Sequence, residues 1–406
     1  MDSVESICGK EPIELPVLDP AYKADPHRLY ARLREEGRSV VRIRLPTGVE
    51  GWLVTGFEAA RTVLCDARMS KCSPARPTTP AHPLFNHLLT LDPPEHTRLR
   101  SIVAREISAR RIATLRPRIV ELAESLLDQA VACDPVDLIQ AYAQPLPLRI
   151  ICGLIGVPDG DEPQILEWSR ELAAADLDDV SQVPAIAGRL HDYLSGLAST
   201  QEDSPDYTVL GALARAERRG DLRESEVAAL AYLLLMAGHE TTVHLIGNGV
   251  LALIRDRSQW TRLCRHPELA PAFVEELLRV ESPLEVATAR YATNEITLEG
   301  RCIRPGDLVF VSLAAANRDP GRYASAAEID PGRESVGSHL AFGHGIHFCA
   351  GAALARLQGE IALSTLARRC PHLEIATPIE ALEWMPGLIL RGLRGLPVHL
   401  GGGRAA

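Results

Sequence analysis

One short segment concentrates residues that could bind a metal: FGHGIHFCAG, residues 342–351. The glycines at 343, 345 and 351 free the backbone to take positive φ angles and let another group approach closely. The run after Cys349, AGAALARLQGEIALSTLARR, predicts a helix. Cys349 is therefore expected at or just before a helix N-terminus, which lowers a thiol pKa and favours thiolate. A thiolate with one open side, in a glycine loop, is what an axial haem ligand requires.

Two other interpretations of this segment stay open at this point. A cysteine near a helix start is most often simply buried, and the nine cysteines of the chain are scattered, without a C-x-x-C pair. His344, His347 and Cys349 could also bind zinc, although structural zinc sites use two spaced ligand pairs and H-x-x-H-x-C offers three ligands in a row.

Composition limits the class of protein. The 406 residues are 46% apolar and 24% charged, which is typical of a globular protein, and the net charge of −10 argues against a nucleic-acid partner. The segment MDSVESICGKEPIELP lacks the apolar core of a signal peptide. The longest apolar run, residues 227–238, is too short for a bilayer and predicts a buried core helix. We expect a soluble, cytoplasmic protein with no membrane partner and with mostly reduced cysteines.

The elements that must position the cysteine loop are mainly helical. We expect a single domain over residues 1–406, mainly α with small β-sheets. Helical periodicity predicts helices in residues 26–37, 118–132, 226–254 and 268–282. Short β-rich runs predict strands in residues 39–45, 51–56, 295–300, 307–313 and 397–400, the first two joined as a hairpin. Four prolines make residues 73–83 a long loop, and residues 199–207 form a polar break between helices.

The pattern F-G-x-G-x-H-x-C-x-G resembles the haem-binding signature of the cytochrome P450 family. The sequence matches it at every fixed position: Phe342, Gly343, Gly345, His347, Cys349 and Gly351. The resemblance implies a helix-rich triangular prism with haem b between a long central helix and the cysteine loop. It also implies that Cys349 is the axial ligand of the haem iron.

A second motif lies in the most apolar helix. Ala237, Gly238, Glu240 and Thr241 resemble the A-G-x-E-T-T motif of the family. The threonine hydroxyl can bond to the carbonyl of Ala237, four residues back, and so open the helix, while Gly238 weakens the same turn. The resemblance implies that Ala237 and Gly238 border the haem and that Glu240 and Thr241 are catalytic, relaying protons to bound oxygen.

An ion-pair triad is the third point of resemblance. Glu276 and Arg279 share a helix face in FVEELLRV, and Arg333 stands where the family places a third partner. The alternative is an exposed ion pair of little energetic value.

Four cationic residues resemble the family's clamp for the two haem carboxylates. His96 and Arg100 lie four apart in LDPPEHTRLR, Arg290 precedes a predicted strand, and His347 belongs to the cysteine loop. Taken singly, each could instead be a solvated cation.

The resemblance implies a monooxygenase that inserts one atom of O2 into a lipophilic small molecule, by hydroxylation or epoxidation of a polyketide, terpenoid or steroid. Electrons would come from a ferredoxin and an NAD(P)H-dependent ferredoxin reductase, because the chain carries no G-x-G-x-x-G segment for its own nicotinamide or flavin. Residues 98–118 hold seven Arg and one Glu and could attract an acidic ferredoxin. Oxidative coupling, desaturation or a non-catalytic haem role are the alternatives.

The resemblance also suggests residues that line the substrate pocket, in addition to the loop 73–90. They are mostly apolar, which suits a lipophilic guest: Leu88, Leu233, Ala237, Leu284, Val286, Ala287, Leu388 and Ile389. Glu285 is the polar exception and is predicted to meet a polar or basic group of the substrate.

Overall fold

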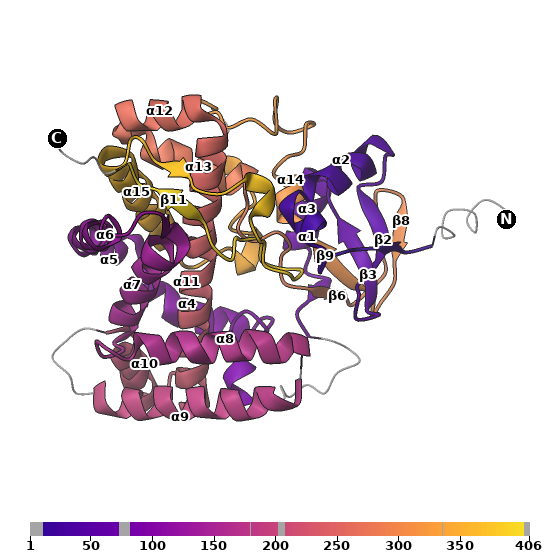
Figure 1. The fold of residues 1–406 in the computed structure, drawn as a ribbon. Coiled ribbons are helices and arrows are strands. Elements are labelled where there is room, and N and C mark those ends of the chain that lie inside the picture. The colour runs from indigo at the N-terminus through magenta and orange to yellow at the C-terminus, as the bar shows by residue number, and fades with distance from the viewer. Residues whose placement is uncertain (1–10, 73–81, 179, 202–207, 335, 402–406) are drawn as a thin grey trace, which may run out of the picture.

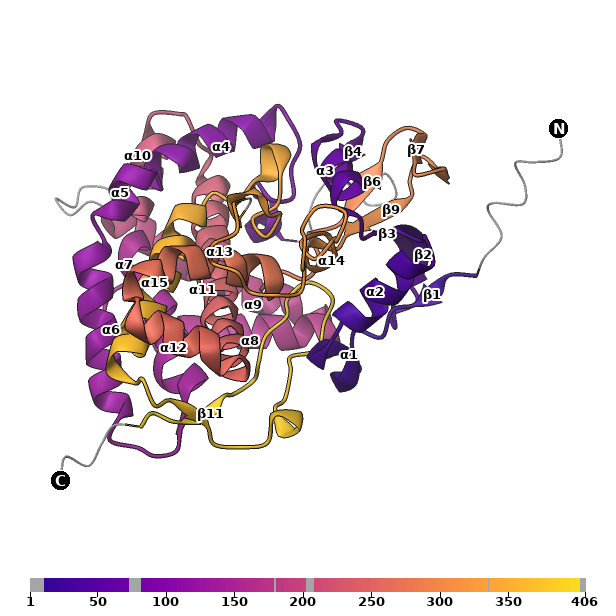
Figure 2. The same cartoon turned by 90° about the horizontal axis from the view of Figure 1, so that it is seen from above.

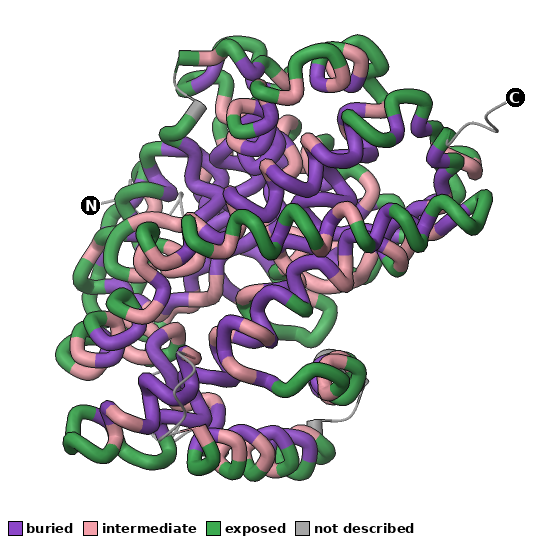
Figure 3. Tube along the Cα trace, turned by 90° about the vertical axis from the view of Figure 1, so that its left-hand side faces the viewer, coloured by how far each residue is buried: buried purple, intermediate pink, exposed green. Residues whose placement is uncertain are grey.

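A helix of 32 residues, α11 (Glu224–Arg255), runs through the helical part of the molecule (Figure 1). The computed structural model describes residues 11–72, 82–178, 180–201, 208–334 and 336–401. By length and composition α11 could cross a membrane, but 67% of its most apolar window is buried inside the protein. The prediction of a buried core helix is therefore confirmed, and Figure 3 shows buried segments surrounded by exposed outer helices.

The other helices follow the chain order. Their bounds are α1 Pro20–Ala24, α2 His27–Glu35, α3 Phe57–Cys65, α4 Glu95–Glu106, α5 Ala109–Ala113, α6 Arg116–Ala130, α7 Pro145–Ile155, α8 Glu162–Asp178, α9 Val183–Gln201, α10 Val209–Arg218, α12 Arg257–Arg265, α13 Ala270–Val280, α14 Leu313–Ala316 and α15 Ala352–Arg369. The four helices predicted from periodicity correspond to α2, α6, α11 and α13 and are confirmed.

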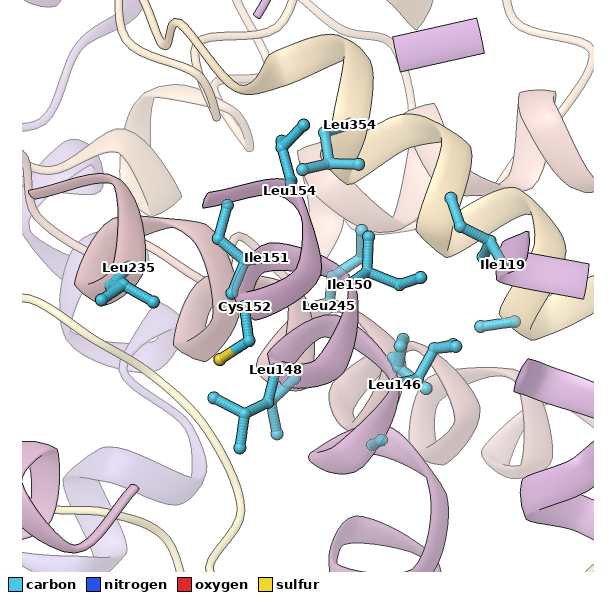
Figure 4. Packing of buried hydrophobic residues seen from close by; sticks show 14 of the residues in the cluster. Ile119, Leu146, Leu148, Ile150, Ile151, Cys152, Leu154, Leu235, Leu245 and Leu354 are labelled. Atoms are coloured by element: carbon cyan, nitrogen blue, oxygen red, sulfur yellow. The ribbon is translucent and has the colours of Figure 1, made fainter. Parts of the chain in front are cut away.

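Helix α7 packs along α11 in the main core (Figure 4). Its side chains Ile151 and Leu148 are buried, as are Leu235 and Leu245 of α11. A Cβ atom at Gly238 would lie 2.9 Å from Cγ1 of Ile151, so a glycine is needed there for the two helices to approach. The opening of the helix predicted for this turn is not seen, since α11 is a continuous α-helix from Glu224 to Arg255, and packing is the reason that the structure gives for the glycine.

The strands form small sheets beside the helices (Figure 1). Their bounds are β1 Ile13–Glu14, β2 Val40–Arg44, β3 Glu50–Val54, β4 Met69–Ser70, β5 Val136–Asp137, β6 Arg290–Ala292, β7 Ile296–Leu298, β8 Arg301–Ile303, β9 Leu308–Val311, β10 Glu374–Ile375 and β11 Pro397–His399. The largest sheet has the order β1-β2-β3-β9-β6-β4. All five predicted strands are present, as β2, β3, β7, β9 and β11.

The hairpin predicted around PTG is confirmed, since β2 and β3 pair antiparallel with Val40 opposite Val54. The parallel pairing of β3 with β9, with Trp52 opposite Val309, joins distant parts of the chain. Seen from above, these strands lie to one side, while α15 lies among α6, α12 and α13 (Figure 2). Most of the predicted proline-rich loop, residues 73–81, and most of the polar break, residues 202–207, lie outside the described residues.

Candidate functional site

The loop before α15 is closed by its own backbone. The amide of Cys349 donates to the carbonyl of Phe342 at 2.9 Å, and the amide of Phe348 donates to that of Gly345 at 3.0 Å. Gly343 and Gly345 both have φ of 71°, a left-handed conformation that side chains disfavour. The glycines therefore allow the tight path that brings Cys349 to the start of α15, whose N-cap is Gly351.

Gly345 has a second reason to lack a side chain. A Cβ atom there would lie 2.7 Å from the carbonyl oxygen of Leu64 and 3.2 Å from the sulfur of Cys65, at the end of α3. The cysteine loop therefore rests directly on α3, a helix formed almost 300 residues earlier in the chain.

The electrostatics of Cys349 differ from the expectation for a helix start. Burial raises the pKa of the thiol, while the Gly351 amide and the guanidinium groups of Arg100 and Arg356 act in the opposite direction. The predicted net lowering is wrong for the protein chain alone, because desolvation of the thiolate dominates. A metal ion changes this balance, since a coordinating thiol is deprotonated outright.

Arg100 supports the cysteine loop. Its guanidinium donates to the carbonyl of Phe348 at 2.7 Å. Arg356, from α15, lies over the ring of Phe342 at 4.5 Å and pairs with Glu275 at 2.6 Å. Both cations thus approach the loop from the helices on either side of it.

The other three predicted clamp residues come together on one side of the loop. The rings of His96 and His347 lie 4.4 Å apart. Burial lowers the pKa of His347 to about 3, and the positive charges of Lys71, His96 and Arg290 act in the same direction. Arg290 is buried at the start of β6 and donates to the carbonyl of Thr288 at 3.1 Å.

Lys71 belongs to the same cluster and was missed by the sequence analysis. Its ammonium group donates to the carbonyl of Thr288 at 2.9 Å, to the Thr288 hydroxyl at 2.5 Å and to the carbonyl of Ala289 at 3.1 Å. Burial and the charge of Arg290 lower its pKa to about 6, against the attraction of Asp92. No sequence motif marks this residue, because a single lysine after a short strand is common.

The unsatisfied polar atoms of this cluster test whether haem fits. Both ring nitrogens of His96 and Nδ1 of His347 are buried without a hydrogen-bond partner among the described residues. Lys71 and Arg290 donate to the same carbonyl, although like charges repel. Two carboxylates placed here would receive charge-assisted hydrogen bonds, and Cys349 would offer sulfur to iron. The residues therefore fit haem.

The middle of α11 presents a partly exposed stripe within a mostly buried helix. Leu234, Ala237, Gly238 and Thr241 lie on one face by their i, i+3, i+4, i+7 spacing and are all at least partly exposed. The predicted bond is present, since the Thr241 hydroxyl donates to the Ala237 carbonyl at 3.2 Å. Burial raises the pKa of Glu240.

The ion-pair triad is fully formed, with Glu276 and Arg279 buried and Arg333 partly exposed. Arg279 binds both carboxylate oxygens of Glu276, at 2.8 and 2.9 Å, and neither residue has exposed surface. Arg333 approaches the same carboxylate at 3.2 Å and also donates to the carbonyl of Ala324. The alternative of an exposed ion pair is thereby excluded.

The predicted pocket residues differ in exposure. Ile389 is 38% exposed, and Leu284 and Leu388 are half-buried. Ala237 is exposed, whereas Leu88, Leu233 and Ala287 are buried with only a few per cent of their surface accessible.

Two of the pocket predictions need correction. Val286 has no exposed surface and packs under the N-terminal sheet with Ile43 and Phe310, so it belongs to the core. Glu285 is equally buried and pairs with Lys23 at 2.5 Å, so its carboxylate already has an internal cation and does not face a substrate.

The arginine-rich stretch 98–118 is partly neutralised. Arg98 pairs with Glu95 and Glu226, Arg111 with Glu106, and Arg116 with Glu360. Arg105, Arg110 and Arg118 are exposed. The cationic face is therefore weaker than the sequence count suggests.

The zinc interpretation finds no support in the geometry. Across the described ranges, no group of three or more His, Cys, Asp or Glu side chains is arranged to hold a metal ion. His344 and His347 therefore do not converge with Cys349 on one point.

Comparisons with known proteins identify the family of the chain. A family model described as Cytochrome P450 matches residues 262–391. Cytochrome P450 monooxygenase PikC of Streptomyces venezuelae is 41% identical over 401 residues, which cover 97% of this chain and 95% of PikC. Vitamin D(3) 25-hydroxylase of Pseudonocardia autotrophica is 40% identical over 385 residues, covering 93% of this chain and 94% of that protein.

Solved structures give the same result. The structure of the tirandamycin C-bound P450 monooxygenase TamI matches with a TM-score of 0.85 and 39% identity, covering 96% of this chain and all of that chain. Because relatives this similar span nearly the whole sequence, the chain belongs to the cytochrome P450 family and is a haem-dependent monooxygenase.

Proposed function

We propose that this monooxygenase oxidises a lipophilic secondary metabolite in the cytoplasm, with haem b held by Cys349. The observation that carries the proposal is the position of one cysteine, in a closed glycine loop, beside a cluster of cations that lacks enough acidic partners. Haem with a thiolate ligand supplies the activation of O2 and the transfer of one oxygen atom to the substrate.

The chain's own residues bind and orient the cofactor. Cys349 binds the iron, and Arg100 holds the loop through the carbonyl of Phe348. His96, Arg290 and His347 receive the two carboxylates, and Lys71 adds a further positive charge close to them. Phe342, Gly343 and Gly351 shape the loop that carries Cys349. Ala237 and Gly238 would border the haem from the side of α11.

Proton transfer falls to two neighbouring residues of α11. The Thr241 hydroxyl donates its hydrogen to the Ala237 carbonyl, which leaves its oxygen free to accept a proton or a hydrogen bond. Glu240 keeps its proton to a higher pH than an exposed carboxyl group, because burial raises its pKa. The pair is therefore suited to hold a proton and pass it on.

Substrate and electrons would enter on different sides. Apolar side chains at Leu284, Leu388 and Ile389 suit a lipophilic guest, and the name of the vitamin D(3) relative supports this class.

For electron transfer, a ferredoxin supplied by an NAD(P)H-dependent reductase would approach the cysteine loop. Ile346 and Phe348 are 52% and 39% exposed there, close to Arg100, and exposed apolar groups with cations suit an acidic protein partner.

The first experiment is the absorption spectrum of the reduced, carbon monoxide-treated protein. The wild type should show a strongly red-shifted Soret band, and Cys349→Ser should lose it, because the band requires thiolate ligation. Cys65→Ser is the matched control, since Cys65 touches the same loop through Gly345 but cannot replace the ligand. A band that survives in Cys349→Ser would contradict the proposal.

The reaction class is decided by product mass. Turnover of a bound lipophilic compound should add one oxygen atom, labelled when the gas is ¹⁸O2. A product that has lost two hydrogens without gaining oxygen would instead indicate coupling or desaturation.

A further inference from the structure

A buried lysine joins two segments that border the proposed substrate pocket. Lys23, the fourth residue of α1, donates from its ammonium group to the carboxylate of Glu285 at 2.5 Å. The same group donates to the carbonyls of Gly387 and Leu390, each at 2.9 Å. All three ammonium hydrogens therefore have an acceptor, and Lys23 and Glu285 have no exposed surface.

The carboxylate is held from its other side as well. The hydroxyls of Tyr22 and Tyr30 donate to Oε1 of Glu285 at 2.7 and 2.8 Å, while Lys23 takes Oε2. The ion pair is thus fully hydrogen-bonded. A buried pair of this kind contributes little net stability compared with apolar side chains of the same volume. Its role is therefore to fix the relative positions of the segments that it joins.

The two segments are also joined directly. The amide of Glu285 donates to the carbonyl of Ile389 at 2.8 Å, and Leu284 forms a bridge with Leu390. Arg391 adds a second link between the turn and α1. The Arg391 guanidinium donates to the carbonyls of Lys23 and Ala24 at 3.2 and 3.0 Å. The C-terminal end of α1 and the turn 387–391 therefore hold each other in place.

The side chains carried by these segments are only partly held by the core, against which Leu284 and Leu388 pack while Ile389 does not. Ile389 lies between the two carbonyls that Lys23 binds and is 38% exposed, and Leu284 and Leu388 are half-buried. Their positions depend on the backbone that carries them. The segment that contains Glu285 continues to Thr288 and Arg290, so the same backbone also reaches the cation cluster.

We propose that Lys23 is a positioning residue for the substrate pocket: by binding Glu285, Gly387 and Leu390 at once, it reinforces the direct backbone contacts between the segments that carry Leu284, Leu388 and Ile389 and holds both segments against α1. This inference rests on the proposed function, because it assumes that these side chains contact the substrate. Lys23 itself contacts no substrate.

The test compares two ligands of the haem iron in the intact holoenzyme. Imidazole binds the iron without reaching the pocket walls, whereas phenylimidazole also contacts them. In Lys23→Met the affinity for phenylimidazole, measured by spectral titration, should fall about tenfold, equivalent to about 1.4 kcal/mol, while the affinity for imidazole stays unchanged. The red-shifted carbon monoxide band should be retained.

Two further variants separate positioning from stability. Tyr30→Phe removes one bond to Glu285 but leaves Lys23 on the turn 387–391, so it should lower the melting temperature and keep wild-type affinity for phenylimidazole. Lys23→Met combined with Glu285→Gln removes the unpaired buried charge, so it should regain stability but not affinity.

Unchanged binding of phenylimidazole in both Lys23 variants would overturn the proposal, and so would an equal loss for imidazole. Neither result would touch the proposed function, which instead fails if the wild type lacks the red-shifted band.

Discussion

Two cation-rich clusters of this molecule differ in whether their polar atoms have hydrogen-bond partners. Around Glu276, two guanidinium groups share one carboxylate and the remaining donors reach backbone carbonyls. Around Thr288, Lys71 and Arg290 share a neutral carbonyl, and nearby histidine nitrogens have no partner among the residues that the structure describes. The difference teaches where to look for a ligand: a balanced cluster, in which the donors and acceptors all have partners, holds the chain together, whereas an unbalanced one, with polar atoms left over, is completed by something that binds.

The largest effect is expected from breaking the balanced cluster. Arg279→Met should lower the free energy of unfolding by about 3–5 kcal/mol, because it leaves the Glu276 carboxylate buried without its main partner. Urea denaturation of the holoenzyme measures this loss. Arg61→Met, at an exposed pair with Glu58, is the control and should change stability little. Equal effects of the two variants would show that burial of the triad has no energetic consequence.

Removal of a cation from the unbalanced cluster around Thr288 should weaken haem binding without lowering the stability of the haem-free protein. Lys71→Met should leave the haem-free protein as stable as the wild type or more so, because it removes an amine whose charged form is disfavoured first by burial and then by Arg290. The same variant should release haem about tenfold faster, since a charge-assisted contact of about 1.4 kcal/mol is lost. Transfer of haem to an excess of apomyoglobin measures the rate. A destabilised apoprotein with a normal rate of haem release would show that Lys71 stabilises the fold and does not bind haem.

The smallest effect, expressed per pH unit, is a pH dependence of the stability of the haem-free protein. The folded pKa of Lys71 is lowered to about 6 from 10.5, so between these values the unfolded chain binds the proton and the folded chain does not. Stability should therefore rise with pH across this window, by less than about 1.4 kcal/mol per pH unit. Urea denaturation at several pH values should give a shallower slope for Lys71→Met. An identical pH dependence of stability in the wild type and Lys71→Met would show that Lys71 does not titrate in this range.

The sequence predicts the local parts of this fold well. The helices α2, α6, α11 and α13 follow from periodicity, and the hairpin of β2 and β3 follows from two β-rich runs around PTG. The pairing of β3 with β9 could not be predicted, because no local pattern encodes a contact across that distance in the chain.

The site shows the same limit. Cys349 and the clamp residues are found through a motif, while Lys71 lies in none. Glu285 is the clearest failure, since its cation, Lys23, lies 262 residues earlier and the sequence alone leaves the carboxylate without a partner. The role of a buried charged residue can be predicted only when its partner can also be identified from the sequence.

The pairing of β3 with β9 has a consequence for biosynthesis. Val54 and Val311 are partners in this parallel ladder, so one edge of β3 stays unpaired until the later strand has been translated. At about 5–20 residues per second this interval lasts about 13–50 s. During it the unpaired edge of the strand EGWLV can meet other chains, and the charges of Arg42, Arg44 and Glu50 on the hairpin oppose such pairing. Production of this protein should therefore depend on nascent-chain chaperones before it depends on the supply of haem.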